Sequence, residues 1–186
     1  KYLLQHNNDL LIFDYIVERD GIQKERLDNT DFYKPITSKQ YFSEALAAWN
    51  KVYRVSLFKE TGIRFPERIF YEDLATSPCL AIHAASIGVI KEPLYHYVQR
   101  GSSIMHTSDV QRMMEIIPAM KVVLEYYKQQ GKFEEYYEEL EYLAVCNILC
   151  STVQRILSVR YDGSKIKQLE QFVRKVRKVT FIKYAH

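Results

Sequence analysis

Hydrophobic and polar positions divide the chain into a first part of short elements and a second part of long helices. Residues 10–17 are almost all apolar, which predicts a strand covered on both faces, as in an α/β sheet. The polar stretch that follows, with Asp20-Gly21, predicts a turn or surface loop. Residues 38–48 have the spacing of a helix, with Ser38 as its N-cap.

Further along, the pattern predicts two more helices and a strand. A short helix is expected near residues 56–61, and another over residues 72–86, ended by Gly88. Residues 89–98 predict a strand. Pro93 within it indicates an edge position, because proline cannot donate to the hydrogen-bond ladder.

The last third of the chain has the longer period of amphipathic helices. They are expected over residues 108–130, 133–159 and 165–183. Pro118 is expected to kink the first of them, and Gly131 to separate it from the second.

We therefore expect an α-rich α/β fold in two parts. Residues 1–107 would contain a sheet with flanking helices, and residues 108–186 an all-helical annex. Six glycines and five prolines in 186 residues argue against a loop-rich all-β fold and against disorder. The net charge of +3 is too small to indicate nucleic acid, which we exclude as a partner.

The three cysteines fit neither a zinc site nor a disulfide framework, since their number is odd and their spacing unsuited. Cys146 and Cys150 are one helical turn apart and are expected to be small buried hydrophobes. A reducing cytosol is the expected compartment. No stretch reaches the ~20 apolar residues that a membrane-spanning helix needs.

The last predicted helix is basic on one side and apolar on the other. Residues 165–183 hold seven Lys or Arg against one acid, Glu170. One interpretation is a peripheral contact with anionic lipid, which would suit a lipid-linked substrate. The other is a helix packed on its own domain with a solvated basic face. The preceding helix is rich in glutamate, so the two helices could pair within this chain, or between copies to form a homodimer through the annex.

The stretch from residue 49 to residue 106 carries the candidate chemistry. Its motifs, in chain order, are Trp49-Asn50-Lys51-Val52-Tyr53, Gly62-Ile63-Arg64-Phe65-Pro66, Tyr71-Glu72-Asp73-Leu74, Pro93-Leu94-Tyr95-His96-Tyr97 and Gln99-Arg100-Gly101-Ser102-Ser103-Ile104. Each motif alone is common. Their joint order closely resembles the C-terminal part of family 2 glycosyltransferases, bacterial inverting enzymes with a GT-A fold that build cell-surface glycans. The resemblance covers roughly residues 9–107.

Glycosyl transfer needs a base that takes a proton from the acceptor hydroxyl, and cations that hold the leaving diphosphate. The resemblance implies that Asp73 is the general base and that Glu72 places the acceptor or its loop. Neighbouring helical positions point about 100° apart, so the two carboxylates are not expected to act as an equivalent pair. The alternative is that both acids only stabilise a helix N-terminus.

The candidate substrate-binding residues lie on both sides of these acids. They are Trp49, Asn50, Lys51, Arg100, Ser102 and Ser103. Lys51 would meet the diphosphate as a point charge and Arg100 as a fork of donors; the alternative for both is a solvated basic loop. The resemblance implies that the loop of residues 99–103 closes over the diphosphate. Trp49, the single tryptophan, is either a platform for a sugar ring or part of the core.

The divalent metal that such enzymes use, Mn²⁺ or Mg²⁺, has few candidate ligands here. His106 is placed where some GT-A enzymes supply an extra metal ligand; the alternative is a structural or exposed histidine. The chain has no Asp-x-Asp pair and no Gly-rich phosphate loop. We therefore expect the metal and nucleotide determinants to precede Lys1, and this fragment to bind no metal and turn over no donor by itself.

Together these expectations describe the acceptor-binding and catalytic-base portion of a hexosyl-type transferase. It would transfer a sugar from a nucleotide-sugar donor to a glycan or lipid-linked acceptor in cell-surface polysaccharide and cell-wall synthesis. The expected location is the cytoplasm, or the inner face of the membrane. The alternative is a non-catalytic interaction module whose annex binds a partner or a membrane surface.

Overall fold

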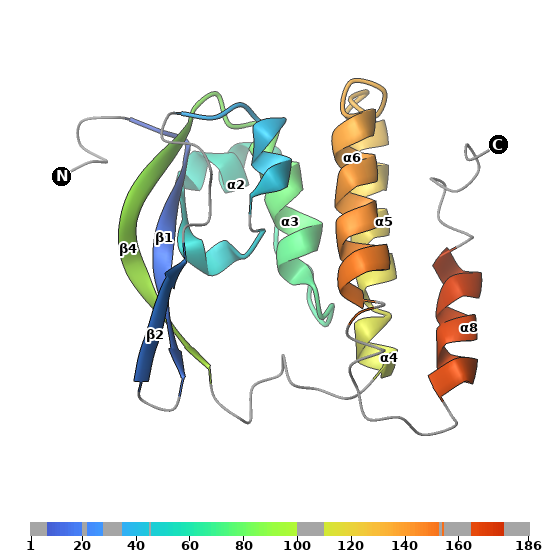
Figure 1. Cartoon of the computed structure of the whole chain (residues 1–186). Coiled ribbons are helices and arrows are strands. Elements are labelled where there is room, and N and C mark those ends of the chain that lie inside the picture. Colours follow the sequence, from blue (N-terminus) through green and yellow to red (C-terminus); the bar gives the residue numbers. More distant parts are fainter. Residues whose placement is uncertain are drawn as a thin grey trace. The chain divides into compact units, whose positions relative to one another are not determined.

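The chain forms two compact units, which the computed structural model describes over residues 7–19, 22–27, 35–44, 46–99, 110–152, 154 and 165–176. The first unit contains Lys1–Phe65 and Thr76–His106, and the second contains Pro66–Ala75 and Thr107–His186. The strands belong to the first unit and most of the long helices to the second (Figure 1). This is the helix-rich α/β fold that the sequence predicts.

Strand β1 (Leu10–Arg19) is the centre of a four-stranded sheet. One edge pairs antiparallel with β3 (Lys51–Tyr53) and β2 (Ile22–Leu27). The other edge runs parallel to β4 (Ile87–Gln99) along its whole length (Figure 1). The first residues of β1 are buried on both faces, as a continuous apolar run requires. The predicted strand over residues 10–17 is confirmed.

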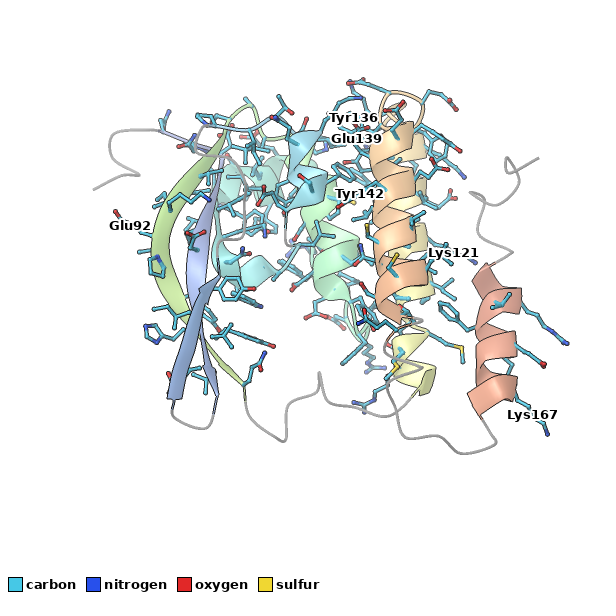
Figure 2. All side chains as sticks on the ribbon, in the orientation of Figure 1. Glu92, Lys121, Tyr136, Glu139, Tyr142 and Lys167 are labelled. Carbon is cyan, nitrogen blue, oxygen red and sulfur yellow. The ribbon has the colours of Figure 1, made fainter. Side chains whose placement is uncertain are left out.

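Strand β4 is an edge strand, as Pro93 indicated. A single bridge, between Ile36 and Ile87, adjoins its outer edge among the described residues. Pro93 lies opposite Asp14, and the register slips on both sides of that pair. The slip is a bulge in which β4 has residues without a partner on β1. One of them is Glu92, which projects from β4 on the side away from β1 (Figure 2).

The polar stretch after β1 continues the sheet instead of ending in a loop. Ile22–Leu27 pairs with Tyr15–Arg19 as a hairpin, with a bulge between Val17 and Glu18. The sequence of β2 has no apolar alternation, although its main chain pairs with β1. This is why the hydrophobic pattern missed it.

The predicted helix over residues 38–48 is wrong. The chain forms two single-turn 3₁₀ helices instead, η1 (Gln40–Ser43) and η2 (Ala48–Asn50). The start of η1 is closed by Thr37: the Gln40 N–H donates to Thr37 Oγ1 at 3.2 Å, and the Thr37 N–H to Gln40 Oε1 at 2.9 Å. Glu44 then adopts an extended conformation, which stops the helix after one turn.

The core of the first unit includes a cluster on one face of the sheet. Its buried members are Leu10, Ile12, Ile36, Tyr41, Ala81, Ile87 and Val89. Helix α2 (Val55–Thr61) follows β3 and ends at Gly62, whose φ of 70° is left-handed, as a glycine C-cap allows. The predicted helix near residues 56–61 is confirmed.

Helix α3 (Glu72–Ala81) begins where the sequence predicts and ends five residues before the predicted boundary. Gly88 does not end it but lies in β4, paired with Leu11. A Cβ on Gly88 would stand 2.9 Å from Leu11 Cδ1 and 2.8 Å from Asn8 Oδ1. The glycine is therefore explained by close packing within the sheet.

In the second unit, the first predicted long helix is divided into α4 (Val110–Met113) and α5 (Ile116–Gln129). The break lies ahead of Pro118 and not at it. Pro118 occupies the first turn of α5, where its missing N–H would have no partner within the helix, so it need not bend the chain. Gly131, with φ of 65°, ends the helix as predicted.

The second long helix is α6 (Tyr137–Ala144), continued by the π-helix η4 (Val145–Thr152). Side-chain bonds follow the wide turn: Ser151 Oγ donates to Cys146 O, and Thr152 Oγ1 to Asn147 O, both at 2.8 Å. Cys150 is exposed and Cys146 half-buried, so the prediction of two buried thiols is wrong for Cys150. A sequence pattern read at the α-helical period misplaces residues in a π-helix, which has a longer period.

Helix α8 (Lys165–Val176) covers the described part of the predicted basic helix. Phe172 is completely buried, whereas Lys167 and Arg174 are exposed, and Lys167 extends away from the ribbon in Figure 2. Burial of Phe172 favours packing of the apolar side within the protein. Membrane contact and a homodimer through the annex stay predictions. Within the described residues, no helix combines the length and apolarity needed to cross a membrane.

Candidate functional site

The Trp49–Tyr53 motif begins in the tight turn η2 and continues into β3. Lys51 is only 7% exposed, and its ammonium donates to Ala47 O and to Asn50 Oδ1, both at 2.7 Å. The same ammonium lies 5.6 Å from the centre of the Tyr41 ring. Asn50 is fully buried, and its Nδ2 has no hydrogen-bond acceptor among the described residues. The structure thus brings Asn50 and Lys51 together, and the ammonium of Lys51 points into the turn η2.

Trp49 belongs to a cluster of four aromatic rings from three elements. Its indole is stacked on Tyr97, with the ring centres 4.9 Å apart and the planes inclined by 7°. It is also stacked on Tyr95, at 4.9 Å and 24°. Tyr15 meets Trp49 edge-on, at 4.6 Å and 88°. Trp49, Tyr15 and Tyr97 are half-buried and Tyr95 is exposed, so the cluster reaches the surface.

The phenol of Tyr15 is affected by this arrangement. Burial, together with the nearby phenol of Tyr97, raises the pKa of Tyr15 above its usual value. The centres of the two rings are 6.4 Å apart. The phenol of Tyr15 is thus present as a neutral hydroxyl group near pH 7, able to donate and to accept hydrogen bonds.

Glu72 and Asp73 are the first two residues of α3. Glu72 is exposed and Asp73 is half-buried, which fits side chains that point in different directions. The segment before them is held by a hydrogen bond from the Phe70 N–H to Glu115 Oε2 at 2.9 Å. The Ala75 N–H donates to Tyr71 O at 3.0 Å, which closes the first turn of the helix. Both acids belong to the second unit, whereas the aromatic cluster belongs to the first.

Four of the predicted site residues lie outside the described residues: Arg100, Ser102, Ser103 and His106. Their roles stay predictions. No group of three or more His, Cys, Asp or Glu that could hold a metal ion is found in the described ranges. By themselves, the described residues therefore do not fit a metal site.

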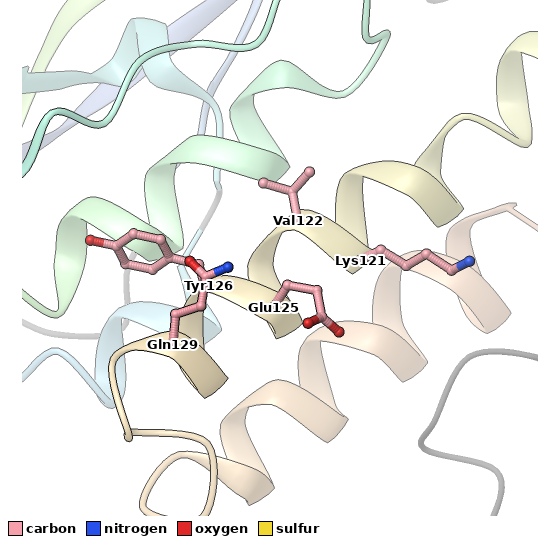
Figure 3. Close-up of a pocket in the computed structure, with 5 residues that line it drawn as sticks. All are labelled: Lys121, Val122, Glu125, Tyr126 and Gln129. Atoms are coloured by element: carbon pink, nitrogen blue, oxygen red, sulfur yellow. The ribbon is translucent and has the colours of Figure 1, made fainter.

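A hollow of about 380 Å³ lies on the surface of the helical unit (Figure 3). Its lining comes from α5 alone: Lys121, Val122, Glu125, Tyr126 and Gln129. It has one cation and one carboxylate, and it contains none of the predicted site residues. Its chemistry gives no indication of a reaction.

Three of the four clustered rings were not predicted from the sequence. Tyr15, Tyr95 and Tyr97 are ordinary tyrosines in strands. The available signal was the alternation of Tyr95 with Tyr97, which places both on one face of a strand. What the sequence could not show is the parallel register that sets Tyr15 beside Tyr95.

The chain is similar in sequence to a protein that carries the name of a putative glycosyltransferase. The protein named "Putative glycosyltransferase EpsH", of Bacillus subtilis (strain 168), is 26% identical over 167 residues, which are 84% of this chain and 48% of that protein. No protein-family model matches the chain.

Solved structures of S. aureus TarS, residues 1–349, have a similar fold. The complex with UDP matches with a TM-score of 0.65 at 14% identity, over 94% of this chain and 48% of TarS. The complex with UDP-GlcNAc matches with a TM-score of 0.56 at 18% identity, over 94% of this chain and 51% of TarS. The chain thus spans about half the length of the relatives it matches. By sequence it is similar to a putative glycosyltransferase, and its fold is similar to that of about half of TarS.

Proposed function

We propose that this chain is the acceptor-binding and catalytic-base portion of an inverting, family 2 hexosyltransferase that uses a nucleotide-sugar donor. The acceptor would be a glycan or a lipid-linked glycan of the bacterial cell surface. The observation that carries the proposal is the pair Glu72-Asp73 at the start of α3, in a chain that is similar to a glycosyltransferase and to a fold solved with UDP-GlcNAc.

The chemistry follows from the asymmetry of the two carboxylates. Asp73, half-buried, would accept the proton of the acceptor hydroxyl as its oxygen attacks the anomeric carbon. The bond from that carbon to the donor diphosphate breaks, and the configuration at the anomeric carbon is inverted. Glu72, exposed at the neighbouring position, would orient the acceptor. The hydrogen bond from Phe70 to Glu115 supports this role, because it fixes the segment that precedes the base.

The leaving diphosphate needs positive charge. Lys51 would have to give up its hydrogen bonds to Ala47 and Asn50 to provide it. Arg100, followed by Ser102 and Ser103, is therefore the stronger candidate for the diphosphate. A divalent metal, Mn²⁺ or Mg²⁺, would be held mainly by the part of the enzyme that this chain does not contain, with His106 as a further ligand. It would supply charge to the same diphosphate.

The test is a transfer assay on two polypeptides. One is this 186-residue chain, and the other also carries the remaining length seen in its relatives. Each is incubated with Mn²⁺ or Mg²⁺, a panel of UDP-, GDP- and dTDP-sugars, and extracted cell-surface glycan. We expect the longer polypeptide to release nucleotide with at least one donor and the 186-residue chain to release none. Absence of release by the longer polypeptide with every donor would overturn the proposal.

A further inference from the structure

The four-ring cluster is gathered on one face of the sheet by strand register. In the parallel pair of β1 and β4, Tyr15 is the partner of Tyr95, and Val17 is the partner of Tyr97. Partner residues point to the same face. Trp49, on η2, then packs its indole against both β4 tyrosines. None of the four rings belongs to the buried cluster around Leu10 and Ile12, so they form a separate surface feature.

We propose that Tyr15, Trp49, Tyr95 and Tyr97 form a binding site for a sugar ring of the acceptor glycan. This inference rests on the proposed function and names the part of the molecule that holds the acceptor. Tyr95 is 38% exposed, so aromatic surface is open to a ligand. One face of a pyranose carries C–H groups of slight positive charge, and these stack on the negative face of an aromatic ring.

The rings of the cluster support one another. Each ring is held by at least one other, through two stacked contacts and one edge-on contact to Trp49. A site that is fixed before binding avoids the entropic cost of ordering its side chains. The phenol hydroxyls of Tyr15 and Tyr97 add groups that can donate hydrogen bonds to sugar hydroxyls and accept hydrogen bonds from them.

Lys51 and Asn50 act as positioning residues for this site. The ammonium of Lys51 bonds the main chain at Ala47 and the side chain of Asn50, at the two ends of the turn that carries Trp49. These contacts join the two ends of the turn from which the indole projects. They also direct the charge of Lys51 into the turn.

That electrostatic arrangement favours an uncharged ligand. A nucleotide base can also stack on tyrosine, but its diphosphate needs cations, and the lysine next to the platform is engaged in the turn. A neutral sugar ring needs only the aromatic faces and the hydroxyl groups. We therefore assign the platform to the acceptor and not to the donor.

The experiment uses the fluorescence of Trp49, the single tryptophan of the chain. The 186-residue chain is titrated with chitotriose, cellotriose, maltotriose and, separately, UDP. We expect a saturable change of intensity or wavelength with at least one trisaccharide, with a Kd of about 1 mM, typical of a single weak site. An unchanged spectrum with all three trisaccharides would overturn the proposal. So would a response to UDP alone, which would assign the rings to the donor base.

Variants separate stacking from folding. Tyr95→Ala should weaken trisaccharide binding at least tenfold, whereas Tyr95→Phe keeps the ring and should keep binding. Tyr142→Ala is the matched control, since Tyr142 is 50% exposed on the helical unit and should leave binding unchanged. Circular dichroism of each variant verifies folding. Equal binding by Tyr95→Ala and the parent chain would contradict the site.

The outcomes also separate this inference from the proposed function. If the chain binds a trisaccharide through Tyr95 but the longer polypeptide never transfers sugar, the platform is a glycan-binding site and the transferase proposal fails. If transfer occurs and Tyr95→Ala does not raise the KM for the acceptor, the platform is wrong and the transferase proposal stands.

Discussion

Lys51 is compatible by sequence with two roles, a phosphate contact or a bond within its own turn, and its contacts in the structure distinguish them. A lysine within a Trp-Asn-Lys motif is a reasonable phosphate contact by charge alone. In the structure its ammonium is buried, 2.7 Å from Ala47 O and from Asn50 Oδ1. The sequence identifies the motif, but the direction of the side chain depends on the turn η2, which has no periodic signal.

The cysteines give a prediction at the same scale. Cys79 is buried in α3, and burial raises the pKa of its thiol to about 12. Because the thiolate is the reactive form, Cys79 should stay unlabelled by iodoacetamide from pH 7 to pH 9, while exposed Cys150 reacts. Mass spectrometry of digested peptides measures both.

In 6 M guanidinium all three cysteines should become labelled, which serves as the control. Labelling of Cys79 at the rate of Cys150 in the folded chain would show that α3 is not packed as described. Cys146, half-buried, should react more slowly than Cys150.

At the scale of elements, the sequence predicts the helices and strands that are specified by their own local residues. β1 is a continuous apolar run, α2 ends at a glycine, and Gly131 stops α5 with a left-handed φ of 65°. The failures are elements determined by neighbours. β2 depends on pairing with β1, and the stretch after Thr37 is broken into two 3₁₀ turns. In the candidate site, the motifs were predictable from the sequence. The pairing of Tyr15 with Tyr95 was not, because it depends on the parallel register of β1 and β4.

Gly131 allows a direct test of the helix end. Gly131→Ala should destabilise the chain by ~1–2 kcal/mol, the cost of a left-handed conformation for a residue with a Cβ. Steric overlap does not cause this loss of stability, since a Cβ at Gly131 would meet nothing within 4 Å. The urea midpoint measures the change, with the exposed Gln129→Ala as control. Equal midpoints for the two variants would contradict the assigned backbone conformation.

Asp9 joins three elements at the start of β1. One carboxylate oxygen accepts from Arg54 Nε at 2.8 Å, and the other accepts from the N–H groups of Ala85 and Ser86 at 2.9 and 3.2 Å. Asp9→Asn would set an NH₂ group against these donors, so we expect a loss of ~1–3 kcal/mol in unfolding free energy.

The matched control for Asp9→Asn is Glu125→Gln, which removes only an exposed pair with Lys128 and should cost less than ~0.5 kcal/mol. Urea unfolding measures both variants. A loss for Asp9→Asn no larger than for Glu125→Gln would show that the junction does not depend on the carboxylate.

For the molecule as a whole, the central fact is that the chain spans about half of its relatives. The proposed chemistry divides accordingly: the acceptor and the base lie here, and the nucleotide and metal are bound mainly elsewhere. The proposed base lies in the unit of residues Pro66–Ala75 and Thr107–His186, and the aromatic platform in the other.

The most direct test of the account is single-turnover transfer by the longer polypeptide carrying Asp73→Asn. Loss of the base should lower the rate by about 10²–10⁴-fold, because the amide cannot accept the acceptor proton, while UDP binding measured by calorimetry stays unchanged. Glu139→Gln, a half-buried acid on α6, is the control and should transfer normally. Transfer by Asp73→Asn within a few-fold of the parent rate, with folding intact, would contradict the account.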